Sequence, residues 1–198
     1  MIFDFTERWK NMTQTFGNEL FTALILVLCI PITGFLIGGI LRLLYRLVAG
    51  FAGNRIAYFI FNRLTFIGVF HHELSHAVLA TITGAQVTKI VFFHPEGDRL
   101  GYVQYVARGN VLARSVQQTM TSIAPVFCGA ITAGCLGHYL AGASLPVWEM
   151  CLLWYVEISV VLHMTMSTQD FKVMWKGIPA VYLLVLAGVV IFRFQLPF

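Results

Sequence analysis

Charged residues are scarce in this chain. Only 11% of its 198 residues are Asp, Glu, Lys or Arg, whereas 58% are hydrophobic and the mean hydropathy is +0.78. A soluble globular domain carries about 25% charged residues, because its whole surface must face water. This composition excludes an isolated soluble domain and a disordered tail, and it predicts an integral membrane protein. The net charge of +4 says little about partners, since basic loops are normal on the cytoplasmic side of a membrane.

Two kinds of cluster are also missing. No group of Lys and Arg alternates with aromatic residues, so nothing favours nucleic-acid binding. The cysteines form no CxxC pair and lie in apolar stretches, which indicates small hydrophobic residues rather than disulfides or zinc ligands. They are Cys29, Cys128, Cys135 and Cys151.

The first 19 residues do not have the pattern of a secretory signal. Asp4, Glu7 and Glu19 precede the first apolar run, where a basic region would be expected. The aromatic residues of this segment instead indicate an amphipathic helix lying on the membrane interface. Residues 20–198 are expected to form a single membrane domain.

Long apolar stretches predict an all-α polytopic membrane protein with about five transmembrane helices. The clearest stretch, Leu20 to Leu41, has 22 residues without a charge, close to the roughly 20 needed to cross a bilayer. Gly84 is expected to end the second span, and Pro125 to break the third. The predicted spans are residues 20–41, 56–83, 116–141, 147–166 and 173–192.

A β-hairpin is predicted between the second and third spans, over about residues 86–107. VTKIVFF and GYVQYVA are rich in β-branched and aromatic residues, and HPEGDRL between them has turn composition. Two interpretations have equal weight. An exposed strand edge could hold an unwound substrate by backbone hydrogen bonds, or the hairpin only connects two spans on the membrane surface.

The distribution of basic residues predicts the orientation. With five spans, the N-terminus, the hairpin and the loop at Asp170 lie on one side, which then holds eight of the 13 basic residues. Because Lys and Arg concentrate on the cytoplasmic side, the N-terminus is expected inside.

His72-Glu73-Leu74-Ser75-His76 is an HExxH motif in the second predicted span. On a helix, positions i and i+4 share a face, so both imidazoles can reach one metal ion, and Glu73 can take a proton from a nearby water. A random order of these residues would give roughly 0.005 such motifs. Ionisable residues inside a span mark function by default; the alternative, hydrogen bonding between helices alone, does not explain the spacing. His71 lies about 100° off this face, which favours a supporting or packing role.

A hydrolytic zinc site normally has three protein ligands and one open position. Asp170 is the preferred third ligand, because it lies at a span boundary on the same predicted side as His76. Its alternative role is a helix cap, since Ser167-Thr168-Gln169-Asp170 matches the capping-box pattern; the two roles are compatible in part. His163 is the reserve ligand, and Glu157 is expected to be protonated or paired. The other candidates are Glu149 and His138.

These residues, in this order, resemble the site-2 protease family of intramembrane zinc metalloproteases, and most of all its small bacterial members. The resemblance covers roughly residues 56–175. It implies zinc ligation by His72, His76 and Asp170, with Glu73 as general base. It is carried by His72-Glu73-Leu74-Ser75-His76-Ala77, Gly84, the hairpin, Ala124-Pro125 and Asp170.

The chain departs from the family pattern before Asp170. Family members typically carry Asn-x-x-Pro ahead of an Asp-Gly pair, whereas this stretch is His163-Met-Thr-Met-Ser-Thr-Gln-Asp170-Phe171. Asp170 is therefore matched by its place in the chain rather than by its neighbours.

The function implied by the resemblance is an intramembrane zinc metalloendopeptidase of a bacterial cytoplasmic membrane. Its substrates would be membrane proteins or peptides in the bilayer, and a regulatory membrane partner is left unidentified. The main alternative is a non-proteolytic membrane metal-binding protein, such as a sensor or a partner subunit; the presence of Glu73 argues against it, because a structural zinc site needs no base. A metal transporter is disfavoured because the ionisable residues crowd toward one side.

Overall fold

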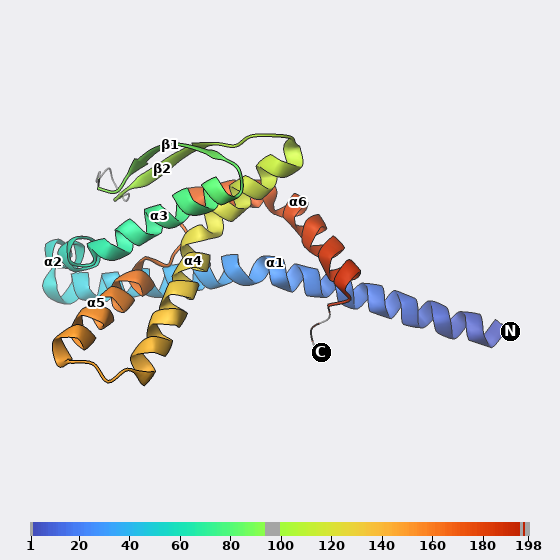
Figure 1. Ribbon diagram of the computed structural model, residues 1–198, viewed down its shortest axis with the longest axis horizontal. Helices are drawn as coiled ribbons and strands as arrows, with labels where there is room; N and C mark the ends of the chain where they lie inside the picture. The colour runs from blue at the N-terminus through green and yellow to red at the C-terminus, as the bar shows by residue number, and fades with distance from the viewer. Residues whose placement is uncertain (1, 94–99, 195, 197–198) are drawn as a thin grey trace.

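The computed structural model describes residues 2–93, 100–194 and 196, with side chains described from residue 13 onward. Most of the described residues are helical, and among them one antiparallel pair of strands lies between two helices (Figure 1). An all-α protein with a small hairpin is therefore confirmed. In chain order the elements are α1 Ile2–Ala52, α2 Asn54–Tyr58, the π-helix η1 Phe59–Leu64, α3 Phe66–Ile82, β1 Gln86–Val91, β2 Tyr102–Val106, α4 Val111–Gly142, α5 Val147–His163 and α6 Thr168–Phe192.

Three helices among the described residues are long and apolar enough to cross a membrane, fewer than the five expected. They are Thr13–Ala52, Val111–Gly142 and Thr168–Phe192. The predicted 56–83 span divides at Thr65, where a π-helical turn ends, and α5 ends at His163 instead of continuing to residue 166. At 1.5 Å per residue, the 17 residues of α3 and of α5 reach only about 26 Å, less than the roughly 30 Å of a bilayer core.

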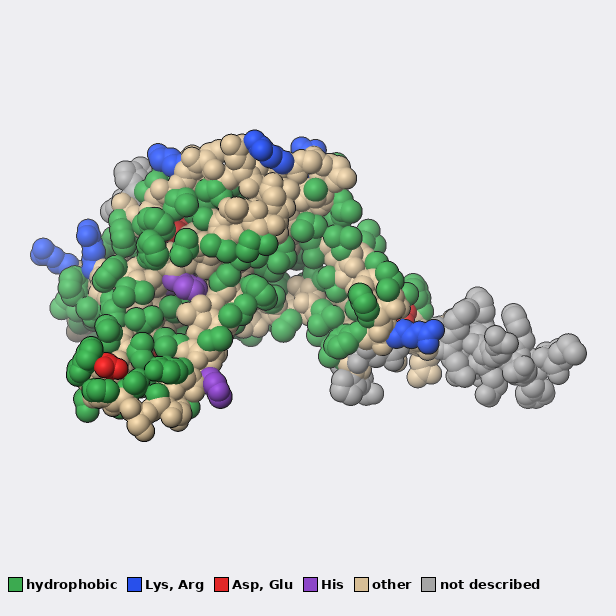
Figure 2. Space-filling model, in the orientation of Figure 1, with side chains coloured by type: hydrophobic (Ala, Val, Ile, Leu, Met, Phe, Trp, Pro, Cys, Tyr) green, Lys and Arg blue, Asp and Glu red, His purple; other side chains and the backbone are tan. Residues whose placement is uncertain are grey.

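The exposed surface is compatible with a membrane. Large apolar side chains point outward on the long helices; Phe35 on α1 and Leu183 on α6 are each 63% exposed. Hydrophobic side chains cover much of the face in Figure 2, and the basic side chains lie at its edges. Apolar patches of this extent are uncommon on soluble monomers.

The long helix α1 runs unbroken from Ile2 to Ala52, with Pro31 inside it. Residues 1–19 and the predicted first span therefore share one helix from residue 2 onward, and its N-terminal end projects beyond the other helices (Figure 1). Most side chains on which the interfacial prediction depends belong to residues 1–12 and lie outside the described ones; Phe16, which is described, is exposed. Helix α4 is likewise continuous through Pro125, so the predicted break in this span is wrong; a proline removes one hydrogen bond, which other groups in a bundle can replace.

The hairpin is anchored to α3 at one end and to α4 at the other. Strands β1 and β2 pair from Gln86↔Val106 to Val91↔Tyr102, with an irregularity between Val87 and Lys89. Next to β1, the Phe92 ring packs on Phe70 of α3 at 4.4 Å between centroids. At the other end, Gln117 exchanges hydrogen bonds with the backbone of Arg108. The expected turn at residues 94–99 lies outside the described residues.

Glycines allow close helix contacts around one region. A Cβ at Gly177 of α6 would lie 2.6 Å from the Ser115 carbonyl oxygen of α4, and one at Gly68 of α3 would clash with the Ser159 carbonyl of α5. A Cβ at Gly34 of α1 would lie 3.2 Å from Cγ of Met166 in the α5–α6 connection. Small residues let helix backbones approach in this way in membrane proteins. These contacts bring α3 close to α5, the start of α4 close to α6, and α1 close to the α5–α6 connection.

Candidate metal centre

The HExxH motif lies on α3, where helical spacing turns its two histidines toward each other. The Nε2 atoms of His72 and His76 are 3.2 Å apart, and the rings meet edge to face. His76 is buried, whereas His72 is half-buried at the wall of a cavity. Positions i and i+4 of a helix are neighbours on one face, so the spacing of the motif is sufficient to explain this contact.

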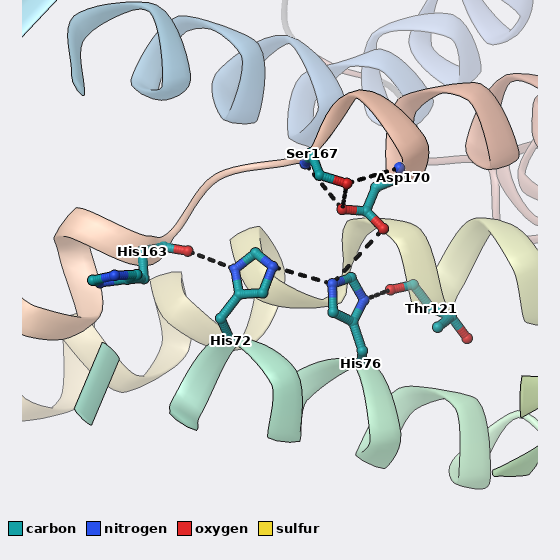
Figure 3. Close-up of polar contacts among 6 residues, drawn as sticks. All are labelled: His72, His76, Thr121, His163, Ser167 and Asp170. Atoms are coloured by element: carbon teal, nitrogen blue, oxygen red, sulfur yellow. Dashed lines mark hydrogen bonds and ion pairs between the residues drawn. The ribbon is translucent and has the colours of Figure 1, made fainter. Parts of the chain in front are cut away.

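Backbone carbonyls hold the opposite edge of each imidazole ring. Nδ1 of His72 donates to the carbonyl of His163 at 2.8 Å, and Nδ1 of His76 donates to the carbonyl of Thr121 at 2.7 Å (Figure 3). A carbonyl oxygen can only accept, so each Nδ1 carries the proton. In a neutral imidazole the Nε2 atom then presents a lone pair. The two facing Nε2 atoms therefore offer two acceptors to a cation, an arrangement found in metal-binding histidines.

Asp170 reaches the same point from the first turn of α6. Its Oδ2 accepts from the backbone N–H and the hydroxyl of Ser167, at 2.9 and 2.5 Å, and Ser167 Oγ accepts from the Asp170 N–H. Its Oδ1 lies 3.8 Å from Nε2 of His76 (Figure 3). The predicted capping box is present, and it leaves one carboxylate oxygen directed toward the histidines. The two predicted roles of Asp170 are thus compatible.

The donor atoms fit a divalent metal ion. One ligand atom from each of His72, His76 and Asp170 lies within 4.8 Å of the others, the one such group of three among the described residues. Two nitrogens bound tetrahedrally at about 2.05 Å would be about 3.3 Å apart, and the Nε2 atoms are 3.2 Å apart. Oδ1 of Asp170, which lies 3.8 Å from Nε2 of His76, would move slightly closer to the two nitrogens to bind the same ion. Imidazole and carboxylate ligands suit zinc and other first-row transition ions.

Glu73 lines the same cavity as His72, His76 and Asp170 but is not one of the three potential ligands. It is 6% exposed, and the cavity has a volume of about 930 Å³, within the usual range for ligand sites. Gly101, the residue before β2, covers Glu73 closely, since a Cβ there would lie 2.9 Å from Cγ of Glu73 and 3.0 Å from its Oε1. Glu73 is therefore fixed next to a space that water or a small peptide segment can enter.

The remaining sequence candidates have other surroundings. The His163 ring bonds through Nδ1 to the Ser159 carbonyl at 2.9 Å, so its contribution to His72 is its backbone oxygen. His71 bonds to the Thr132 hydroxyl at 3.0 Å, in line with its supporting role. Oε2 of Glu157 is buried without a hydrogen bond among the described residues. Neither His138 nor Glu149 joins a group of potential metal ligands in the described part of the chain.

Three residues that line the cavity were not predicted from the sequence. Arg42 of α1 brings a cation to the cavity wall, Gly101 lies against Glu73, and Tyr105 of β2 faces the cavity. Burial raises the pKa of the Tyr105 phenol, and the Asp170 carboxylate raises it further, so the phenol stays protonated at neutral pH and can donate a hydrogen bond. No local motif marks these residues, because their role depends on how the hairpin and α1 pack.

Comparisons with known protein families, with curated proteins and with solved structures find no match for this chain. Function therefore has to be inferred from the geometry of the site.

Proposed function

We propose that this protein is an intramembrane zinc metalloendopeptidase. The observation that carries the proposal is the meeting of His72 and His76 with Asp170, which lies 94 residues after His76 in the sequence, beside a buried Glu73 in a common cavity. A structural metal site closes its coordination with protein ligands, whereas a hydrolytic site has three ligands and an acid–base group next to an open position. The set of three ligands and a glutamate is the hydrolytic arrangement.

Each residue has a defined task in peptide hydrolysis. His72, His76 and Asp170 would hold zinc, which when bound supplies Lewis acidity to a water molecule and to the scissile carbonyl. Glu73 takes the proton from the attacking water and later delivers it to the leaving amine, as a general base and then a general acid. The carbonyls of Thr121 and His163 keep both imidazoles oriented, and the hairpin keeps Glu73 in place.

The setting of the site supports substrates that are membrane proteins or membrane peptides. The surrounding helices are apolar outside, and the cavity wall carries polar side chains among apolar ones. We further propose a bacterial cytoplasmic membrane with the N-terminus inside. The resemblance of the HExxH region to site-2 proteases supports this location. The bias of basic residues supports the orientation only if five spans cross the membrane, since with the three long helices alone the N-terminus and the hairpin would lie on opposite sides.

Purified protein in detergent or nanodiscs tests the proposal by two separate measurements. Elemental analysis should find about one zinc per chain in the wild type and in Glu73→Gln, and a loss of zinc in His72→Ala. Cleavage of a fluorescent transmembrane peptide should fall by at least 100-fold in Glu73→Gln, since it lacks the base. His138→Ala, which removes an exposed histidine of α4, is the matched control and should retain both zinc and cleavage.

Two results would contradict the proposal. Wild-type protein that binds no zinc after supplementation would remove the metal centre. If the protein bound zinc but wild type and Glu73→Gln cleaved the peptide equally, Glu73 would have no hydrolytic role. This result would favour a non-proteolytic metal-binding protein.

A further inference from the structure

The two carbonyls that hold the histidines are available for different reasons. His163 is the last residue of α5, so its carbonyl has no N–H partner within the helix; besides His72, it accepts from the backbone N–H of Thr165 at 2.8 Å. Thr121, in contrast, lies in the interior of α4. An interior carbonyl normally accepts from the N–H of the residue four positions later, so the Thr121 oxygen should be occupied.

The residue four positions after Thr121 is Pro125, which has no backbone N–H. The Thr121 carbonyl therefore lacks its helical donor, although the helix continues. Its oxygen instead accepts from Nδ1 of His76 at 2.7 Å. Thr121, Ala124 and Pro125 are all buried.

We propose that Pro125 is a positioning residue of the metal centre. By withholding an N–H, it frees the Thr121 carbonyl to fix His76 as the Nδ1–H tautomer, with Nε2 turned toward His72 and Asp170. The inference rests on the metal centre proposed above. Metal-binding histidines are usually oriented by a carboxylate or a carbonyl. Here the Thr121 carbonyl orients His76, and Pro125 leaves that carbonyl free to do so.

The other prolines within helices supply a comparison. Pro179 of α6 removes the donor for the carbonyl of Trp175 in the same way. Among the described residues, no side chain donates to that carbonyl at hydrogen-bond distance. Pro179 is therefore a matched control, because replacing it restores a helical hydrogen bond far from the histidines.

The experiment compares Pro125→Ala with Pro179→Ala. Alanine at position 125 restores an N–H that competes with His76 for the Thr121 oxygen. Zinc affinity, measured by competition with a chelator in detergent, should fall about 10-fold in Pro125→Ala, at the lower end for a lost orienting partner because the carbonyl remains. Pro179→Ala should bind zinc as the wild type does. Size exclusion and thermal melting of the metal-free proteins establish that both variants are folded.

A second measurement needs no zinc. Nitrogen-15 NMR of histidine-labelled, metal-free wild type at pH 8, with His76 assigned by its loss in His76→Gln, reports which ring nitrogen carries the proton. We expect the proton on Nδ1 in the wild type and a mixture of tautomers in Pro125→Ala.

Equal zinc affinity in folded Pro125→Ala and wild type would overturn the inference, as would a proton on Nε2 of His76 in the wild type. If the wild type bound no zinc, the proposed function would fail. The tautomer of His76 in the metal-free protein would still show whether Pro125 orients this histidine. A 10-fold loss of zinc affinity in both Pro125→Ala and Pro179→Ala would also overturn the inference. The loss would then come from replacing any helical proline and not from the Thr121 carbonyl.

Discussion

Replacing Gly101 by alanine tests whether the hairpin fixes the position of Glu73. The added Cβ would lie 2.6 Å from the Val91 carbonyl oxygen of the neighbouring strand and 2.9 Å from Cγ of Glu73. Ordinary van der Waals contact begins at 3.4 Å. The Glu73 side chain and the start of β2 must therefore separate by about 0.5 Å, the difference between 3.4 and 2.9 Å.

A shift of this size is enough to affect catalysis. Catalytic groups must be held within about 0.5 Å of their productive position, and a misplacement of about 1 Å can cost about 100-fold in rate. We therefore expect kcat/KM to fall about 10-fold in Gly101→Ala, equal to about 1.4 kcal/mol of transition-state stabilisation. Zinc content should not change, because Glu73 is outside the group of three potential ligands.

The assay measures kcat/KM with a transmembrane peptide, zinc content and the thermal midpoint on the same preparations. Gly188→Ala on α6 is the control, since a Cβ there meets nothing within 4 Å. A Gly→Ala change without a clash often stabilises a protein by about 0.4–1 kcal/mol, because it lowers the conformational entropy of the unfolded chain. A lower kcat/KM in Gly101→Ala would therefore have to come from the contacts that the new Cβ makes. Wild-type cleavage by a folded Gly101→Ala protein would refute the reasoning.

Three further changes test the supports of the site. Ser167→Ala should lower the free energy of unfolding by about 1 kcal/mol through loss of the cap and should weaken zinc binding in a chelator competition; unchanged zinc affinity would mean that the cap does not orient the carboxylate. Gly177→Ala should destabilise the protein by about 1–3 kcal/mol by overpacking α4 against α6, seen as a lower thermal midpoint than that of Gly188→Ala. His163→Ala should keep its zinc on elemental analysis, because its contact with His72 is made by the backbone oxygen; loss of zinc in a folded variant would restore the His163 ring as a ligand.

Local patterns in the sequence predicted the features that depend on local geometry. The HExxH spacing was sufficient to predict that His72 and His76 face each other, because the helix fixes that relation over one turn. Two stretches rich in β-branched and aromatic residues around a turn-like stretch predicted the hairpin, and the [ST]xx[DE] pattern predicted the cap at Ser167. Each of these relations joins residues only a few positions apart, or two strands that follow each other in the sequence.

The features that the sequence did not predict depend on packing between distant elements. The span count was too high because hydrophobicity does not reveal where a helix stops, and Thr65 and His163 end helices within apolar stretches. The break expected at Pro125 was wrong because α4 continues through it. The partner of the Thr121 carbonyl, the approach of Gly101 to Glu73 and the cavity position of Arg42 could only be found once the helices and the hairpin were assembled.

The use of backbone carbonyls as orienting groups fits the electrostatics of a buried site. A charge removed from water is costly unless an opposite charge is close, and this cost is greatest inside a membrane. The charges of Asp170 and Glu73 together would balance a divalent ion, while Arg42 is exposed on the cavity wall. Carboxylates in place of the Thr121 and His163 carbonyls would add two uncompensated negative charges. Neutral carbonyls freed by a proline and by a helix end orient both histidines without that cost.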